Sequence, residues 1–293
     1  MGIDITISKK GLFNKALDIN SFIELLDESD YIILAGDFIS EEIQEGMKYQ
    51  GEPLIVYDSI EIGRGFQIIL EKKEIFLRLP FLCTNKDIEL FYKYTQKICE
   101  AMNITKFVQD GDVYRLEEIN NVRESAIVDN RRFFRDTFFS DDGEVTTIFA
   151  AYFPINIETA WLESIKNLDT MLQLEKYAEY LNDKQRQDVY YARNLLYELK
   201  SGKTIGIYAL TQGVASVVPK EALDFFTKPD IQYVAVVQPS AGDDEFDSFE
   251  VLFDDFKKVI DLDCCPQFDE ATVIVELTSA NIEKLRAYRC EVE

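Results

Sequence analysis

Carboxylates are the one abundant class of side chain in this sequence that could carry acid–base chemistry. The chain has 54 Asp and Glu residues, 31 Lys and Arg residues and no histidine. The lack of histidine excludes Ser-His-Asp triads, Cys-His pairs and imidazole-ligated zinc or iron. Two neighbouring carboxylates with separated pKa values can hydrolyse a glycosidic bond without histidine. Composition cannot single out such a pair, because the acidic residues are so numerous.

Cysteine is the other candidate nucleophile. The odd number and irregular spacing of the five cysteines, without a Cys-x-x-Cys pair, predict buried free thiols rather than a metal or redox site. The adjacent pair Cys264-Cys265 would need Lys, Arg or a helix N-terminus to lower its pKa, and we interpret it as a packed turn before Pro266. The five residues are Cys83, Cys99, Cys264, Cys265 and Cys290.

Two glycine motifs resemble parts of nucleotide-binding loops. Gly63-Arg64-Gly65 starts like a dinucleotide fingerprint, but the third glycine is replaced by Ile68 and the segment continues into a strand. Gly202-Lys203-Thr204 ends like a P-loop, but the partner position is Tyr197, within a predicted helix. We therefore interpret Gly202 as the C-terminal cap of that helix and expect no phosphate-binding loop and no cofactor.

The densest acidic stretch lies at residues 243–263, where nine acids face two lysines. Its spacing partly fits a calcium loop, but Ser248 occupies the position that needs glycine. A second interpretation is a solvated loop followed by an amphipathic helix over 249–260. A third is a docking surface for a cationic partner. The candidate residues of this surface are Asp243, Asp244, Glu245, Asp247, Asp254 and Asp255.

Basic and aromatic residues alternate in Arg131-Arg132-Phe133-Phe134-Arg135, a pattern that can bind nucleic acid. Five arginines between Arg115 and Asp136 are balanced by five acids, however, and the whole chain carries a net charge of −23. We therefore interpret this segment as a helix with its phenylalanines directed inward. Neither nucleic acid nor an anionic membrane is an expected partner of so acidic a chain.

The first half of the chain has clear strand and helix patterns. Ile3, Ile5 and Ile7 alternate with polar residues as in a half-buried strand, and 54–57, 66–70 and 75–79 predict further antiparallel strands. Thr84 to Asp87 has the form of a capping box. It opens a predicted helix whose apolar face includes Cys99, which is therefore a predicted core residue.

The best linker candidate is Ser140–Glu144, which is polar and contains a glycine. It divides the chain into predicted subdomains at residues 1–143 and 144–293, the second with a long helical insert at about 158–200. Strands are predicted at 204–210, 233–237 and 272–277, and a final helix from Ser279. The predicted class is α+β, with mixed or mainly antiparallel sheets.

Several of these segments resemble one known bacterial family. Ile5–Phe13, Ile62–Phe66, Leu77–Pro80 and Asp87–Tyr92 look like a family defined only as a domain of unknown function, DUF4299. The resemblance lies within the first hundred residues. It implies a bacterial cytosolic setting and supplies no activity, cofactor or catalytic residue.

These observations favour a non-catalytic cytoplasmic protein that binds another macromolecule through an acidic surface. The partner would be a basic protein, and the chain could act as its antagonist or immunity-type partner. The alternative is a hydrolase that uses carboxylates, alone or with a divalent metal, on a small or sugar-like substrate. No segment is apolar over the length that a membrane helix needs. The oligomeric state is left open.

Overall fold

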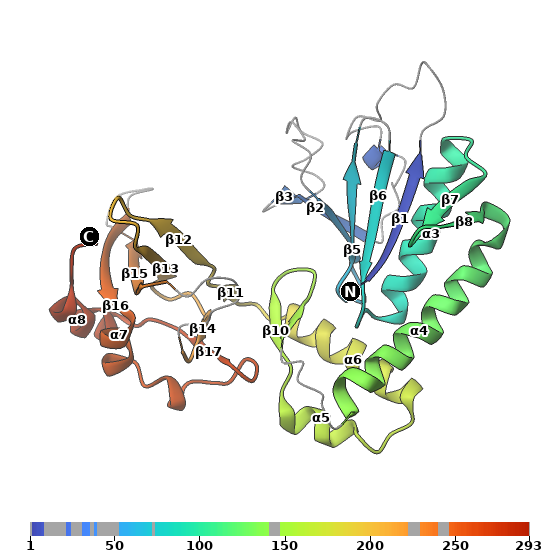
Figure 1. The fold of residues 1–293 in the computed structure, drawn as a ribbon. Helices are drawn as coiled ribbons and strands as arrows, with labels where there is room; N and C mark the ends of the chain where they lie inside the picture. Colours follow the sequence, from blue (N-terminus) through green and yellow to red (C-terminus); the bar gives the residue numbers. More distant parts are fainter. Residues whose placement is uncertain are drawn as a thin grey trace. The chain divides into compact units, whose positions relative to one another are not determined.

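The computed structural model describes residues 2–8, 22–24, 31–35, 38–39, 53–71, 74–140, 147–221, 229–239 and 246–292 (Figure 1). The chain forms two compact units, Met1–Arg186 and Gln187–Glu293. Both units combine helices with sheets whose strand pairs are mainly antiparallel. This confirms the predicted α+β class.

The first unit is built on an antiparallel sheet of eight described strands in the order β3-β2-β4-β5-β6-β1-β7-β8. As predicted, Ile3, Ile5 and Ile7 of β1 are buried on one face while the residues between them are partly exposed. The predicted strands at 54–57, 66–70 and 75–79 are also confirmed. The strands are β1 (Gly2–Ser8), β2 (Tyr31–Ala35), β3 (Phe38–Ile39), β4 (Leu54–Asp58), β5 (Phe66–Leu70), β6 (Glu74–Pro80), β7 (Lys106–Gln109) and β8 (Asp112–Arg115).

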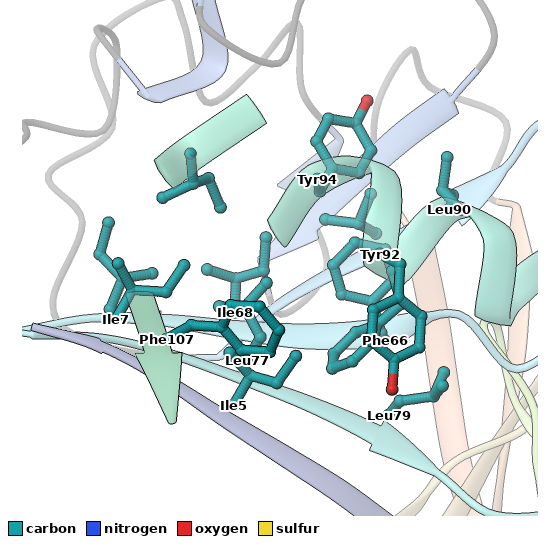
Figure 2. Close-up of a cluster of buried hydrophobic side chains, with 14 of the residues drawn as sticks. Ile5, Ile7, Phe66, Ile68, Leu77, Leu79, Leu90, Tyr92, Tyr94 and Phe107 are labelled. Atoms are coloured by element: carbon teal, nitrogen blue, oxygen red, sulfur yellow. The ribbon is translucent and has the colours of Figure 1, made fainter. Parts of the chain in front are cut away.

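Helix α3 (Asn85–Ala101) packs on this sheet. It begins with the predicted capping box, in which the side chain of Thr84 accepts a hydrogen bond from the backbone of Asp87 and the Asp87 side chain accepts one in return. Its apolar face meets Phe66, Ile68 and Leu77 of the sheet, as Figure 2 shows. Cys99 is buried in the same cluster, as predicted. Helix α4 (Ile119–Phe139) follows and packs beside α3.

A second apolar cluster contains residues from both sides of the predicted boundary at residue 143. Phe134 of α4 packs against Tyr177 of α6 with a ring-centroid distance of 5.2 Å. This shared core explains why the first compact unit ends at Arg186 and not near residue 143. Of the predicted linker Ser140–Glu144, residues 141–144 lie outside the described residues. The remaining elements of this unit are β9 (Thr147–Phe149), β10 (Pro154–Asn156), α5 (Thr159–Ile165) and α6 (Thr170–Gln185).

The second unit contains two small sheets, in the orders β12-β13-β15-β16 and β11-β14-β17. Phe249, Phe253 and Phe256 form part of its core. The predicted strands at 204–210, 233–237 and 272–277 and the final helix are confirmed. The elements are β11 (Tyr190–Tyr191), β12 (Asn194–Glu198), β13 (Thr204–Thr211), β14 (Ser216–Pro219), β15 (Ile231–Pro239), β16 (Phe246–Leu252), α7 (Phe253–Val259), β17 (Thr272–Val275) and α8 (Ser279–Leu285).

Two predicted helical stretches are wrong in part. The helical insert at about 158–200 ends with α6, and the chain then forms β11 and β12. Gly202, with φ of 81°, turns the hairpin from β12 to β13 and caps no helix. The helix predicted over 249–260 begins only at Phe253, because Phe249 pairs with Val236 in a strand. In each case pairing with a neighbouring strand outweighs an apparent helical spacing.

Candidate functional site

The Gly63-Arg64-Gly65 motif surrounds the buried carboxylate of Asp87. Oδ1 of Asp87 accepts a hydrogen bond from the backbone of Gly65 at 2.9 Å, and Oδ2 accepts one from that of Arg64 at 3.0 Å. Oδ2 also accepts from the backbone and the hydroxyl of Thr84, at 2.8 and 2.9 Å. Burial raises the pKa of Asp87, and these donors oppose that effect. The backbone donors that a nucleotide phosphate would need are thus already used.

Further hydrogen bonds hold this loop and the segment Leu82–Cys83, which precedes α3. Arg64 donates through Nε to the carbonyl of Phe149 at 2.9 Å and through Nη1 to that of Phe81. Gln185 of α6 donates to the carbonyl of Gly63 at 2.9 Å. Asn130 of α4 accepts from the backbone of Leu82 and donates to the carbonyl of Cys83. We call this set of loop contacts the Asp87 junction, and its geometry is that of a structural cross-link.

The predicted acidic surface is described only in part. Asp243, Asp244 and Glu245 lie outside the described residues. The other three carboxylates are each paired with a cation of the same unit, and Phe246–Leu252 is a strand, which a twelve-residue calcium loop does not contain. The pairs are Asp247 with Arg286 at 3.0 Å, Asp254 with Lys257 at 3.6 Å and Asp255 with Lys258 at 2.6 Å.

A groove of about 380 Å³ in the first unit is lined by acidic residues, fewer of which are paired with cations than those of the predicted acidic surface. Four of its lining residues are acidic, and no Lys or Arg occurs among the described residues that line it. Its apolar lining comes from Ile3, Phe81, Val122 and Ala126. The remaining lining residues are Gln109, Asp110, Asp112, Tyr114, Glu118, Asn121, Ser125 and Asp129. We call this the acidic groove.

The β7–β8 hairpin and α4 position the carboxylates of the acidic groove. Asp110 and Gly111 turn the hairpin with φ of 51° and 93°. The Asp110 side chain accepts from the backbone of Asp4 at 3.0 Å, which ties this turn to β1. Asp129 lies 3.5 Å from Arg132, whereas Asp110, Asp112 and Glu118 form no ion pair within the described part of the chain. No ion pair with a described residue has to be broken for these three carboxylates to meet an external cation, although Asp110 and Glu118 already accept backbone hydrogen bonds, the latter from Arg115 at 2.7 Å.

The model of the family described as "Domain of unknown function (DUF4299)" matches residues 2–285. The chain belongs to the DUF4299 family. No curated protein and no solved structure matches it. The described parts of the segments that carried the resemblance lie in β1, β6, α3 and the loop of the Asp87 junction, so the recognisable DUF4299 residues build the scaffold of the first unit.

Three carboxylates of this DUF4299 chain are buried among the described residues, and each holds a turn. Asp58 accepts from the backbones of Ile60 and Glu61, and Asp269 from those of Ala271 and Thr272. Asp87 holds the junction described above. All three have a structural role that accounts for their burial. The described residues also contain no group of three Cys, Asp or Glu side chains that could hold a metal ion.

The cysteines are free, as predicted, but they are not all buried. Cys83 and Cys99 are buried, Cys264 is exposed, and Cys265 and Cys290 are partly exposed. Cys264 donates a hydrogen bond to Asp261 at 3.1 Å, and this carboxylate raises the pKa of the thiol. A raised pKa lowers the thiolate fraction, so the pair Cys264-Cys265 has no activated nucleophile in this geometry.

The acidic groove was missed because its acidic residues are balanced in sequence by arginines. The structure brings Asp110 and Asp112 of the hairpin beside Glu118 and Asp129, while Arg123 lines a different groove beside Glu89 and Lys93 of α3. The spacing of Asn121, Ser125 and Asp129 is the signal that could have found it, because residues four apart lie on one face of a helix.

None of the described helices is long and apolar enough to cross a membrane.

Proposed function

We propose that this DUF4299 chain is a non-catalytic cytoplasmic interaction module that binds a basic segment of another protein in its acidic groove. The observation that carries this proposal is the groove lining, with four carboxylates and no Lys or Arg among the described residues. Asp110, Asp112 and Glu118 have no cation of their own among these residues. The net charge of −23 adds a long-range field that would attract a basic partner.

The lining of the groove fits lysine and arginine side chains better than a bare metal ion. Phe81, which is partly exposed, provides an apolar surface for the methylene stem of such a side chain, whereas Ile3, Val122 and Ala126 beneath it are buried. The surrounding carboxylates can pair with their charged ends, and Tyr114 offers a ring for a cation–π contact. A partner with two or more neighbouring basic residues is therefore the best chemical match.

The stretch Asp243–Asp255 remains a proposed second acidic surface. Its described carboxylates already pair with Arg286, Lys257 and Lys258, so a partner would have to displace these cations. Ion pairs at exposed positions are worth only about 0–1 kcal/mol each, which makes displacement feasible. We place the first contact at the acidic groove, where no such displacement is needed at three of the four carboxylates.

A carboxylate hydrolase has weaker support from the geometry. The buried carboxylates Asp58, Asp87 and Asp269 all accept hydrogen bonds from backbone groups of their own turns. A general acid that keeps its proton at neutral pH needs an apolar, desolvating environment, whereas the four carboxylates of the acidic groove are all exposed. An interaction surface accounts for the same residues without this requirement.

Affinity capture tests the proposal with three forms of the full chain. The baits are the unaltered chain, a groove variant and a matched control that changes the charge equally. The groove variant is Asp110→Asn, Asp112→Asn and Glu118→Gln; the control is Asp247→Asn, Asp254→Asn and Asp255→Asn. We expect a basic protein in the eluates of the unaltered chain and the control at about 0.15 M salt, with less of it at about 0.5 M. Equal capture by the groove variant would contradict the proposal.

A further inference from the structure

Strand β12 of the second unit is a sheet edge that no other described strand covers. It lies at the end of the strand order β12-β13-β15-β16, and four of its five residues are exposed. Leu195, Leu196 and Tyr197 have exposed fractions of 47%, 48% and 51%. The strand contains no proline, lysine or bulge, which are the usual means of blocking an edge.

The backbone of β12 presents a fixed set of outward groups. Leu199 donates to the carbonyl of Lys203, so this pair is a hydrogen-bonded pair of the antiparallel ladder. Because such pairs alternate, Leu195 and Tyr197 direct their N–H and C=O groups toward β13. The corresponding groups of Asn194, Leu196 and Glu198 point away from β13. They have no strand partner within the described part of the chain.

These outward groups are self-complementary. We propose that two copies of this chain pair through β12, antiparallel and with a twofold axis at Leu196. In this register Leu196 faces Leu196 of the second copy, and Asn194 faces Glu198 of the second copy, so every outward group finds a partner. Leu195 then lies beside Tyr197 of the second copy, on the sheet face that already carries Ile205 and Ile207. Each half of the contact thus repeats the other, as a twofold interface requires.

The charge around β12 does not suit the basic partner proposed for the acidic groove. Residues 193–203 contain Arg193, Lys200 and Lys203 against Glu198, a local net charge of 3 − 1 = +2 in a chain of net charge −23. A basic partner would meet like charge here, whereas a second copy adds only the repulsion of +2 against +2 between exposed groups, which salt screens. The opposite edge of the sheet, β16, is already in use, since Cys290 donates to the carbonyl of Glu250.

Sedimentation velocity of the full chain over about 1 to 100 µM tests the pairing, because a weak contact shows its monomer–dimer equilibrium in that range. We expect a dimer that becomes a monomer in Leu196→Pro, since proline removes an outward N–H that does not bond β13. The double variant Leu195→Lys with Tyr197→Lys should raise the dimer dissociation constant at least about tenfold, because it sets lysines opposite one another. The matched control is Phe246→Lys at the other edge, where the residue is 65% exposed, and it should leave the constant unchanged.

Thermal unfolding of each variant shows whether it is folded, and if Leu196→Pro misfolds, the lysine double variant decides the question alone. An unaltered chain that stays monomeric at the highest concentration would overturn the proposal. A dimer that persists equally in the folded β12 variants would also overturn it. Because the groove variant does not touch β12, loss of partner capture and loss of dimerisation are separate results.

Discussion

Asp87 is the residue on which the described loops of the first unit depend most. It is almost fully buried, and both of its oxygens accept hydrogen bonds from backbone groups of two separate loops. A carboxyl group suits this position because both of its oxygens can accept in either protonation state, whereas a neutral amide would turn an NH₂ group toward N–H donors. The same side chain caps α3, so one residue links the start of a helix to the Gly63-Arg64-Gly65 loop, called the glycine loop below.

We therefore expect Asp87→Asn to lower the free energy of unfolding by about 2–3 kcal/mol, because it leaves buried donors without an acceptor. Urea unfolding followed by circular dichroism measures this change. The exposed Asp136→Asn is the control and should change stability by less than about 0.5 kcal/mol. Equal effects of the two substitutions would show that the junction does not stabilise the fold.

The pH dependence of this difference has a defined sign. Since burial raises the pKa of Asp87, the native state binds its proton more tightly than the unfolded state does. The stability that Asp87 adds is therefore fully present below the pKa that it has in the unfolded chain. This stability is lost as the pH rises through the pKa that Asp87 has in the native state. We expect the stability difference between the unaltered chain and Asp87→Asn to be larger at about pH 4 than at pH 7. A difference that shrinks on acidification would contradict this sign.

Cys264 gives a second prediction at the residue scale. The Asp261 carboxylate raises the pKa of its thiol, so its alkylation by iodoacetamide should be slow at neutral pH and should accelerate as the pH rises. Asp261→Asn should increase the rate at pH 7, as measured by mass spectrometry of the labelled peptide. The buried Cys83 and Cys99 should stay unlabelled in the native chain. An unchanged rate in Asp261→Asn would show that the carboxylate does not control this thiol.

At the scale of elements, the glycine loop is held by close packing as well as by hydrogen bonds. A Cβ atom at Gly63 would lie 2.7 Å from Oδ1 of Asp87 and would also clash with Oδ2. We expect Gly63→Ala to cost at least about 2 kcal/mol of stability, since a buried carboxylate with fixed partners cannot move away.

Gly202 provides the matched control for Gly63. Its φ of 81° is unfavourable for alanine, but a Cβ there would meet nothing within 4 Å. Gly202→Ala should therefore lower the free energy of unfolding only by the cost of placing alanine in a left-handed backbone conformation, about 1–2 kcal/mol. Thermal and urea unfolding of the two variants would separate overpacking from backbone strain. A larger loss at Gly202 than at Gly63 would show that the carboxylate does not restrict the loop.

Sequence patterns were sufficient for elements whose signal is local. The alternation of Ile3, Ile5 and Ile7 predicted β1, and the Thr84 capping box predicted the start of α3. They were insufficient for β12 and β16, whose strand state depends on pairing with β13 and β15. The acidic groove could not be predicted for a related reason. Its acids come from a hairpin, from the turn before α4 and from α4 itself, and only the fold brings them together.

At the scale of the whole molecule, each compact unit has its own apolar core. The core of the second unit includes Phe249, Phe256 and Ile282, all from residues beyond Arg186. We therefore expect a fragment of residues 187–293 to fold alone, with one cooperative transition in urea followed by near-ultraviolet circular dichroism. A fragment without a cooperative transition would show that the second unit depends on the first.

The net charge of −23 makes the whole molecule attractive to any cation, so binding must be separated from this general effect. The groove variant and its control each remove three negative charges, and they differ in where these charges lie. The carboxylates changed in the groove have no ion pair among the described residues, and those changed in the control do. A difference in their affinity for one basic probe therefore reports where the carboxylates lie and not the net charge.

Isothermal titration calorimetry with a hexalysine peptide tests the proposed function most directly. We expect the groove variant to bind hexalysine at least about tenfold more weakly than the unaltered chain, which corresponds to about 1.4 kcal/mol. The control should lose less than about threefold, because its carboxylates are already paired. Equal losses in the two variants would mean that hexalysine follows net charge alone, and this result would contradict the acidic groove as the binding site.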